Sequence, residues 1–423
     1  MDAPILAIVI CLPLLLILSV PIGVAIGMSV AIAIIIGDIP VQFLMQRMFF
    51  SLDTFPLLAV PFFIMAGEIM QKGSMAQSLL NFSRCLVGHI TGGLAHVSVL
   101  TSMFYGALSG SAPATVAAVG GTMIPSMEKE GFSKSFATAT NVSAGCLGVM
   151  IPPSVPLIIY GTTAGVSVGS LFIAGIVPGL FIGIILMATC YFLSKYYGFK
   201  TKSKKATYKE TLKAFWEAKY AIVVPFIVLG GIYGGVTTPT EAGAIAVTYA
   251  FIVEGIVLRS LDFKKVWEIL RSATLTNATI FLVVATASAL GQILLIYNVP
   301  DLIVDALSGI ADNKMLLLFV IIIMLLILGT FMDALANILI LTPLLHPLVS
   351  GAGIDMTHFG IVMIAAVSLG FLTPPVGVNL FVGCGISKIS IERLSYAVLP
   401  FLFVMLIAVF VLAYVPQISL MLL

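Results

Sequence analysis

A short motif that occurs twice constrains the fold of this chain more than any other feature. Residues 147–153 read Leu-Gly-Val-Met-Ile-Pro-Pro, and residues 369–375, 222 positions later, read Leu-Gly-Phe-Leu-Thr-Pro-Pro. Two consecutive prolines remove two backbone donors and cannot continue a helix. In lipid, broken backbone is tolerated only where it is buried in protein or lines a cavity. Two broken helices in matching positions of two halves are typical of the substrate and ion site of a secondary transporter.

The composition indicates a membrane protein. Of the 423 residues, 60% are hydrophobic and 9% are charged, and the mean hydropathy is +1.19. Soluble domains carry about 25% charged residues. We therefore expect an all-α polytopic membrane protein without a sizeable soluble domain. The first apolar run, 4–19, follows Asp2 rather than a basic residue, so we expect a retained span and not a signal peptide.

A lysine-rich stretch at 195–219 divides the chain into two halves, 1–194 and 220–423. Short loops rich in Lys and Arg remain in the cytoplasm, so we interpret this stretch as a cytoplasmic linker and expect no nucleic-acid binding. Each half opens with two apolar runs and a mixed polar stretch, followed by a third apolar run. Similar spacings then recur: 81 residues from Gly67 to Gly148, and 79 from Gly291 to Gly370. The sequence therefore predicts an internal duplication.

The apolar runs at about 50–72 and 273–296 carry interruptions, which are Pro56 and Pro61 in the first and several Thr residues with Asn277 and Ser288 in the second. We predict a re-entrant hairpin in each; the alternative is an ordinary span of about 20 residues. With hairpins there, each half crosses the membrane five times, and an odd number inverts the second half.

The basic residues agree with inverted repeats. If the linker is cytoplasmic, only Arg47, Lys72 and Arg84 fall on the outer side, as cytoplasmic enrichment of Lys and Arg requires. Both termini are then expected to face outward.

Two stretches inside the predicted spans could bind a cation. In 106–115, Gly110 disfavours regular helix, and Ser109, Ser111 and Thr115 supply hydroxyl oxygens. Hard cations require oxygen ligands, so we predict an unwound helix that binds Na⁺ there. Close packing of small residues between helices is the alternative.

The second such stretch is 329–337, which begins at Gly329 and contains Asp333 and Asn337. A carboxylate deep in an apolar segment indicates a functional site, so we predict another unwound helix. Asp333 would bind Na⁺, or titrate if the coupling ion were H⁺. A helix cap is the alternative role for an Asp.

The breaks themselves, 151–154 and 373–377, could bind the solute. A helix that restarts after a break exposes free N–H groups and a positive dipole end, which attract an anion. A structural kink is the alternative. The predicted substrate-binding residues are Pro152, Pro153 and Ser154 in the first half and Pro374, Pro375, Gly377 and Asn379 in the second, with Thr373 as an additional ion ligand.

Enzymatic chemistry is not indicated. The five cysteines and four histidines show no metal-site spacing, and no phosphate-binding loop or Ser/His/Asp pattern occurs. We expect no ATP hydrolysis and no cofactor apart from the coupling ion, Na⁺. A channel remains an alternative function, and an intramembrane enzyme is a weaker one because Asp333 has no evident catalytic partner.

Several segments resemble the large membrane subunit, of the DctM or SiaM type, of tripartite ATP-independent periplasmic (TRAP) transporters. They follow one order across most of the chain: 62–68 (Phe-Phe-Ile-Met-Ala-Gly-Glu), 109–112 (Ser-Gly-Ser-Ala), 124–127 (Ile-Pro-Ser-Met), 151–154 (Ile-Pro-Pro-Ser), 174–179 (Ala-Gly-Ile-Val-Pro-Gly), 237–242 (Thr-Thr-Pro-Thr-Glu-Ala) and 373–377 (Thr-Pro-Pro-Val-Gly).

The resemblance implies a Na⁺-driven elevator-type importer, with scaffold and transport domains, in a bacterial inner membrane. A periplasmic binding protein would deliver an organic anion such as a C4-dicarboxylate or sialic acid, and a small four-helix membrane subunit would be a separate chain. The residues that the resemblance places in ion or substrate sites are Ser109, Gly110, Ser111, Ser154, Asp333 and Thr373. The sequence leaves open which carboxylate is carried, the number of Na⁺ ions, the residues that contact the partners, and the oligomeric state.

Overall fold

The computed structural model describes residues 2–18, 20–199, 204–311 and 313–423. Helices account for most of these residues, and these residues contain no strand, so the predicted all-α polytopic fold is confirmed. Within these ranges, eight helices are long and apolar enough to cross a membrane, or up to nine if a bent pair counts as one span. In the predicted linker, Lys200 and Lys202 lie outside the described residues.

The first half contains α1 (Ala3–Ile17), α2 (Ile22–Ile36), α3 (Val41–Leu52), the 3₁₀ turn η1 (Phe55–Leu58), α4 (Ala59–Lys72), α5 (Met75–Val87), α6 (Gly93–Ser109), α7 (Ala112–Glu130), α8 (Lys134–Gly145), α9 (Leu147–Met150), α10 (Val155–Ala164) and α11 (Val168–Tyr196). The second half contains α12 (Tyr208–Tyr233), α13 (Pro239–Ile252), the π-helical turn η2 (Val253–Val257), α14 (Phe263–Ile296), α15 (Val299–Ala311), α16 (Lys314–Phe331), α17 (Ala334–Gly351), α18 (Met356–Gly370), α19 (Val378–Ser387), α20 (Ile391–Tyr414) and α21 (Gln417–Leu420).

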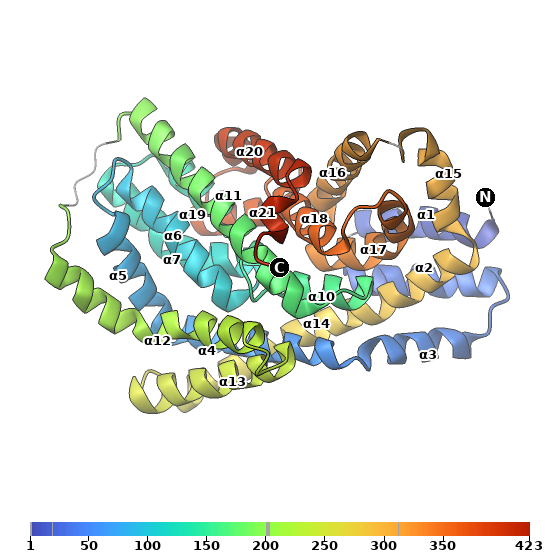
Figure 1. Cartoon of the computed structure of the whole chain (residues 1–423), viewed down its shortest axis with the longest axis horizontal. Helices are drawn as coiled ribbons and strands as arrows, with labels where there is room; N and C mark the ends of the chain where they lie inside the picture. Colours follow the sequence, from blue (N-terminus) through green and yellow to red (C-terminus); the bar gives the residue numbers. More distant parts are fainter. Residues whose placement is uncertain (1, 19, 200–203, 312) are drawn as a thin grey trace.

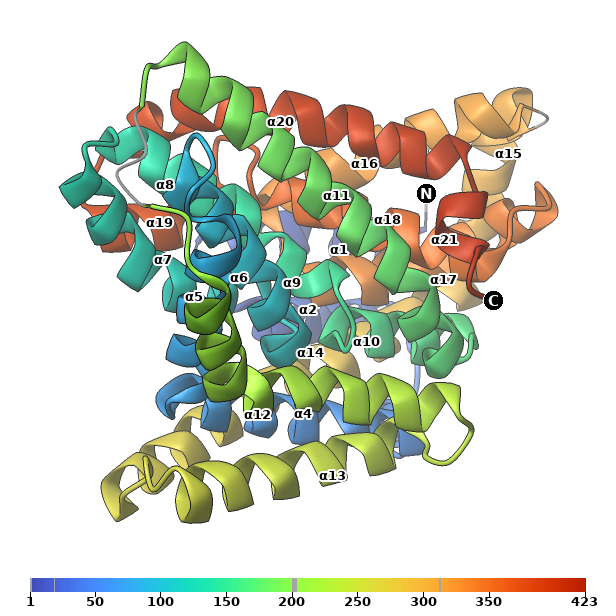
Figure 2. The same cartoon turned by 60° about the vertical axis from the view of Figure 1, so that its left-hand side comes forward.

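Two small groups of helices lie at the edges of the molecule. In Figure 1, α4, α12 and α13 lie along the lower edge and α1 to α3 on the right. In the first group α13 packs on both α4 and α12, and in the second α1 packs on α2. The long helix α14 contacts α2, α3 and α4 and so joins these groups into one framework. The helices α6 to α11 and α16 to α20 contact this framework where α6 and α10 pack on α4 and where α17 packs on α14. In Figure 2 they lie above α4, α12 and α13.

Helices in equivalent places of the two halves make reciprocal contacts. α7 packs on α19 as α17 packs on α10, and α8 packs on α20 as α18 packs on α11. Reciprocal contacts arise when two copies of a unit are related by a two-fold axis. The Cys146 thiol donates to the Ser368 carbonyl at 3.0 Å, and these residues are themselves 222 positions apart. Equivalent positions can touch only near the axis, which therefore passes between Cys146 and Ser368.

The prediction of a hairpin at 273–296 is wrong. α14 runs without a break from Phe263 to Ile296. Its hydroxyls do not interrupt it because they bond back to carbonyls of their own helix, for example Thr276 to Ser272 at 3.0 Å and Thr279 to Leu275 at 3.0 Å.

The prediction of a hairpin at 50–72 is also wrong. The chain leaves the helix at Asp53 and Thr54, but α3 and α4 then follow one another along α14 instead of packing side by side. Pro56 and Pro61 lie in the first turns of η1 and α4, where proline is tolerated because those N–H groups have no helical partner.

The hairpins lie at the two stretches that were expected to be unwound single spans, 106–115 and 329–337. α6 and α7 run antiparallel, with the Ser98 hydroxyl 3.7 Å from Sδ of Met127, and their tip is Gly110–Ser111. In the second half, the Lys314 ammonium at the start of α16 donates to the carbonyl of Gly353, just beyond α17, at 3.1 Å. The tip there is Met332–Asp333. In each half, one predicted hairpin is a crossing and one predicted crossing is a hairpin. The number of crossings in each half is therefore unchanged and still odd.

Two contacts show that Lys72 and Lys314 lie on the opposite side of the membrane from the one that the sequence predicts for each. Lys72 pairs with Glu268 at 3.8 Å, so Lys72 lies on the side of 259–271, not opposite to it. The Tyr414 hydroxyl donates to the Met315 carbonyl at 3.3 Å, so Lys314 lies on the side of the C-terminal end of α20. Both residues were expected on the wrong side because the hairpins were expected in the wrong segments.

Candidate functional site

The tips of both hairpins meet at one cavity of about 160 Å³, which is lined by residues of both halves and which we call the central cavity. The first tip contributes Ser109, Gly110 and Ser111, and the second contributes Asp333. The other lining residues are Ile64 in α4, Pro113 in α7, Val149 in α9, Val155 and Pro156 in α10, Thr276 and Ile280 in α14, Ala334 and Leu335 in α17, Phe371, and Val378 in α19. Four of the predicted ion ligands therefore lie together.

The first tip is a compact group of oxygens. The Thr115 hydroxyl donates to the Ser111 carbonyl at 2.8 Å, and it lies 3.0 Å from the Ser109 hydroxyl. Gly110 has φ +59°, and a Cβ there would meet the Val155 nitrogen at 3.1 Å. The tip thus requires glycine both for its left-handed backbone and for its approach to α10. Thr115 itself is buried behind the cavity wall.

Among the residues that the structure describes, the second tip holds the one carboxylate of the cavity wall. Asp333 caps α17 by accepting the Leu335 N–H at 2.7 Å, so the expected ligand also has the role of a cap. The Asn337 amide donates to the carbonyls of Met332 at 3.2 Å and Asp333 at 3.1 Å. Its Oδ1 is buried and has no partner among the described residues. Asn337 therefore offers an available oxygen one turn behind Asp333.

The chain leaves the helix over 151–154 and 371–377, where the double prolines interrupt it, and the first break bends its span by 42°. In this conformation the predicted break residues lie behind the central cavity. The Ser154 hydroxyl donates to the Val149 carbonyl at 2.6 Å, and that of Thr373 donates to the Leu369 carbonyl at 3.0 Å. These residues lie outside the cavity lining: Pro152, Pro153, Ser154, Thr373, Pro374, Pro375, Gly377 and Asn379.

The same break residues connect the breaks to the rest of the fold. The Gly377 N–H donates to the Thr330 carbonyl of the second hairpin at 3.2 Å. The Asn379 amide donates across the repeat axis to the Val142 carbonyl at 3.2 Å, and its buried Oδ1 is unpaired within the described part of the chain. Gly329 packs against the backbone of Gly370. These residues position the tips and do not line the cavity.

Sequence reasoning missed Thr276, the hydroxyl that α14 contributes to the cavity wall. In the sequence, a hydroxyl within an apolar run favours a helix break, which is why Thr276 is not among the predicted site residues.

Four helices of the described chain begin at the central cavity. α7 starts at Ala112, α10 at Val155, α17 at Ala334 and α19 at Val378, each at or next to a residue of the lining. The first N–H groups of a helix have no intrahelical partner and lie at the positive end of its dipole. Four such ends create a positive field in a small space, while Asp333 and the tip oxygens offer a place for a cation.

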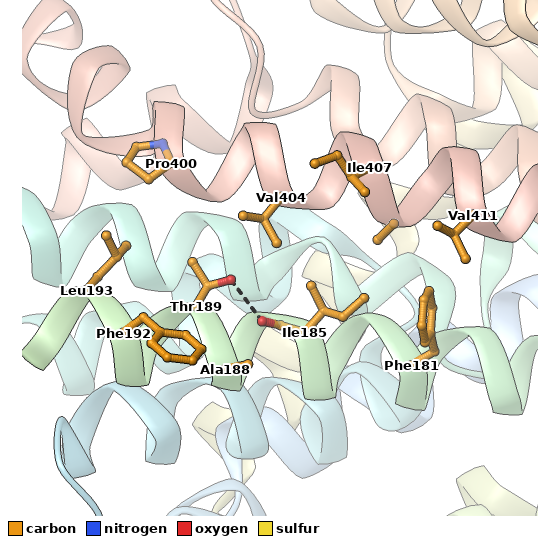
Figure 3. A pocket seen from close by; sticks show the side chains of 11 residues that line it. Phe181, Ile185, Ala188, Thr189, Phe192, Leu193, Pro400, Val404, Ile407 and Val411 are labelled. Atoms are coloured by element: carbon orange, nitrogen blue, oxygen red, sulfur yellow. Dashed lines mark hydrogen bonds between the residues drawn. The ribbon is translucent and has the colours of Figure 1, made fainter.

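A larger groove of about 420 Å³ between α11 and α20 lacks this chemistry (Figure 3). Its lining is almost wholly apolar, and the hydroxyl of Thr189 in its wall bonds to the Ile185 carbonyl of the same helix at 2.9 Å. We therefore locate the functional site at the central cavity.

Residues 9–418 match the family model described as "Tripartite ATP-independent periplasmic transporter, DctM component". The chain belongs to this family.

Named relatives agree with this assignment. The chain is similar to the isethionate TRAP transporter permease protein DctMQ of Oleidesulfovibrio alaskensis, with 45% identity over 90% of this chain and 60% of that protein. It is 38% identical to the sialic acid TRAP transporter large permease protein SiaM of Vibrio cholerae, over 90% and 89% of the two chains. It is 36% identical to the C4-dicarboxylate large permease DctM of Pseudomonas aeruginosa, over 90% and 89%.

The fold also resembles that of the YdaH transporter of Alcanivorax borkumensis, with a TM-score of 0.58 at 15% identity over 89% and 88% of the two chains. The DctM family and its named relatives are permeases, so the prediction that this chain is not an enzyme is confirmed. As a DctM component, it is a polytopic integral membrane protein.

Proposed function

We propose that this DctM component carries out Na⁺-coupled import of a small organic anion across a bacterial inner membrane. The observation that carries this proposal is the central cavity, where four helix N-termini and a carboxylate meet. The N-termini favour an anionic group of the solute, and the hydroxyl, carbonyl and carboxylate oxygens favour a hard cation.

Two oxygen groups are the proposed Na⁺ ligands. The first comprises Ser109, Ser111 and Thr115 at the first tip. The second comprises Asp333 and the Oδ1 of Asn337, which has no partner among the described residues. A Na⁺ ion at either tip would offset the repulsion between Asp333 and an anionic solute. This is a physical reason for the two to bind together.

The charges support an orientation. The hairpins are at α6–α7 and α16–α17. If the linker is cytoplasmic, Arg47 and Lys314 are then the only two of the 20 Lys and Arg residues that lie on the outer side of the membrane. This distribution obeys the positive-inside rule more fully than the topology expected from sequence. The termini again face outward.

An elevator movement is the proposed mechanism. α1 to α5 and α12 to α15 form the proposed scaffold domain, in which α14 bridges α2, α3 and α4. α6 to α11 and α16 to α20 form the transport domain, which carries the central cavity. Backbone crossings tie each hairpin to its neighbouring broken helix, since a Cβ on Gly106 would meet Gly148 Cα at 2.9 Å and one on Gly370 would meet Gly329 Cα at 2.6 Å. Each such unit would move as one body.

The proposed partners are a periplasmic binding protein that delivers the anion and a small membrane permease. Support comes from the relatives' names: one is a DctMQ permease protein, of which this chain spans about three-fifths, and others are called large permeases. Isethionate, sialic acid and C4-dicarboxylates, the solutes in those names, are the candidate substrates.

The test is uptake of radiolabelled solutes into proteoliposomes that contain this chain, the small permease and the binding protein. We expect accumulation of one of the three candidate anions that requires an inward Na⁺ gradient and the binding protein. Equilibration without either requirement would instead indicate a channel, and conversion of the solute would indicate an enzyme.

A further inference from the structure

A second polar cavity lies on the flank of the first hairpin, further from the tip than the central cavity. It has a volume of about 260 Å³ and is walled by α4 and α5 on one side and by α6 and α7 on the other. We call it the α4–α7 cavity. Its polar lining includes Gln71, Gln77, Thr101, Tyr105 and Thr122. It therefore lies between the scaffold and the hairpin, on the way from the central cavity to the open end of that hairpin.

Two hydroxyl groups in its wall lack partners. Tyr105 is 1% exposed and Thr101 is 3% exposed, and neither hydroxyl bonds to any described residue. Leaving a buried hydroxyl unpaired costs about 1–3 kcal/mol. Two such groups in one cavity indicate that a polar molecule fills it.

A row of hydroxyls along α6 extends from the wall of this cavity to the wall of the central one. Thr101, Tyr105 and Ser109 are spaced by four residues and so lie on one face of α6; the first two line the α4–α7 cavity and the third lines the central cavity. On α4, Ile64 and Gln71 are seven residues apart on one face, and they line the central and the α4–α7 cavity respectively. The same two helices therefore line both spaces.

The chemistry of the lining selects a kind of ligand. None of the described residues that line the α4–α7 cavity is charged. Amides and hydroxyls complement hydroxyl groups, whereas a carboxylate or sulfonate would be desolvated there without a cation. The charged end of a solute thus belongs in the central cavity, and its hydroxylated part fits here.

A third polar cavity, of about 280 Å³, is shared by the two halves. It is lined by α14 and α17 of the second half and by α10 and the segment 51–57 of the first half, and its uncharged polar residues include Thr54, Thr162, Thr163, Ser288 and Gln292. The Thr54 hydroxyl is again buried and unpaired among the described residues. Because Thr54, Thr162 and Thr163 belong to the first half, this cavity does not repeat the α4–α7 cavity in the second half.

We propose that the α4–α7 cavity is a second solute subsite that binds hydroxyl groups of the transported molecule on the linker side of the central cavity. This inference rests on the proposed function. It assigns Thr101 and Tyr105 as the residues that favour hydroxylated solutes over their deoxy analogues.

Thiol protection with a neutral polyol tests the subsite without knowledge of the natural solute. Ala118→Cys places a thiol in the cavity wall, and Cys11, Cys85 and Cys384 are replaced by alanine because they are partly accessible. Cys146 and Cys190 stay, since they are fully buried and such thiols are inert. The reaction rate with a small methanethiosulfonate reagent is measured with and without erythritol. We expect a slowing of about threefold at an erythritol concentration of about twice its Kd.

Thr101→Val with Tyr105→Phe should abolish this protection. The matched control is Ser102→Ala, which removes a neighbouring buried and unpaired hydroxyl that does not line the cavity, and it should leave protection unchanged. Tyr105→Phe alone, which should weaken protection, serves if the double variant does not fold. If erythritol does not change the labelling rate, the cavity holds only water and the proposal is wrong. Unaltered protection in the double variant would also overturn it. Na⁺-driven uptake is assayed in parallel, so a failure of the proposed function is seen separately.

Discussion

Asp333 and Glu254 are two carboxylates within apolar helical segments, and their surroundings differ. Glu254 is fully buried and accepts the N–H groups of Ser74 at 2.9 Å and Met75 at 2.8 Å. It also accepts the hydroxyls of Ser74 and Ser260. Asp333 accepts one hydrogen bond, from Leu335, among the described residues and lines a cavity. A buried carboxylate that accepts several hydrogen bonds from the protein has a structural role. A carboxylate that lines a cavity and accepts only one is available to bind a ligand.

Glu254→Gln should destabilise the protein. Glu254 caps α5 from the other repeat, and an amide nitrogen would face N–H groups that the carboxylate now satisfies. We expect a loss of about 3 kcal/mol, because each hydrogen bond to a buried charge contributes about 1.5–3 kcal/mol. Thermal unfolding in detergent measures this as a lower Tm. The control is Glu241→Gln, an exposed capping-box residue, for which the change should be smaller; an unchanged Tm for Glu254→Gln would refute this structural role.

At the scale of helices, the units that matter are pairs of a hairpin arm and a broken helix. Gly106 lies on Gly148 between α6 and α9, and Gly329 lies on Gly370 between α16 and α18. Each contact is backbone against backbone, so no side chain can move aside to admit a methyl group. The two crossings occupy equivalent places in the repeats, which explains why Gly148 and Gly370 both precede a double proline by a fixed distance.

Gly370→Ala should therefore displace the second hairpin. The new Cβ would lie 2.6 Å from the Gly329 backbone, and overpacking of this kind costs about 1–3 kcal/mol. We expect a lower Tm together with impaired uptake. Gly121→Ala is the matched control, because it lies within α7 with nothing within 4 Å of its Cβ, and it should be neutral or slightly stabilising. Equal behaviour of the two variants would show that the crossing does not restrain the hairpin.

At the scale of the whole molecule, the fold class, the repeated breaks and the location of the cavity residues at 109–111 and 333 could be predicted from sequence. Proline pairs, glycines and a deep carboxylate each have a local physical meaning. The hairpins were placed in the wrong segments because a Thr-rich helix in an apolar chain gives no sign that its hydroxyls are bonded internally. Length was the overlooked signal: α6 and α7 contain 17 and 19 residues, together too many for one crossing of about 20.

Cysteine labelling from each side of the membrane tests the topology. The structure places Ser350, at the open end of the second hairpin, on the side of Tyr414, and the proposed orientation makes that side periplasmic. We expect a membrane-impermeant thiol reagent added to intact cells to label Ser350→Cys but not Lys129→Cys, which lies near the open end of the first hairpin. Both positions are exposed, so a difference in labelling reports the side. Labelling of both residues from outside would contradict the arrangement of opposed hairpins.

The central claim is that ion and solute bind together where the two hairpin tips meet, and Asp333→Asn tests it most directly. Asn caps helices about as well as Asp, so α17 should keep its start while the cavity wall loses this charge. The measurement is a Na⁺ titration of solute uptake in the reconstituted three-component system, with Asp355→Asn as control, because Asp355 caps α18 in the same way but does not line the central cavity. We predict that Asp333→Asn loses Na⁺-dependent uptake by at least about tenfold, the equivalent of about 1.4 kcal/mol, while Asp355→Asn retains it. An Asp333→Asn protein with the Na⁺ dependence of the parent would contradict the account.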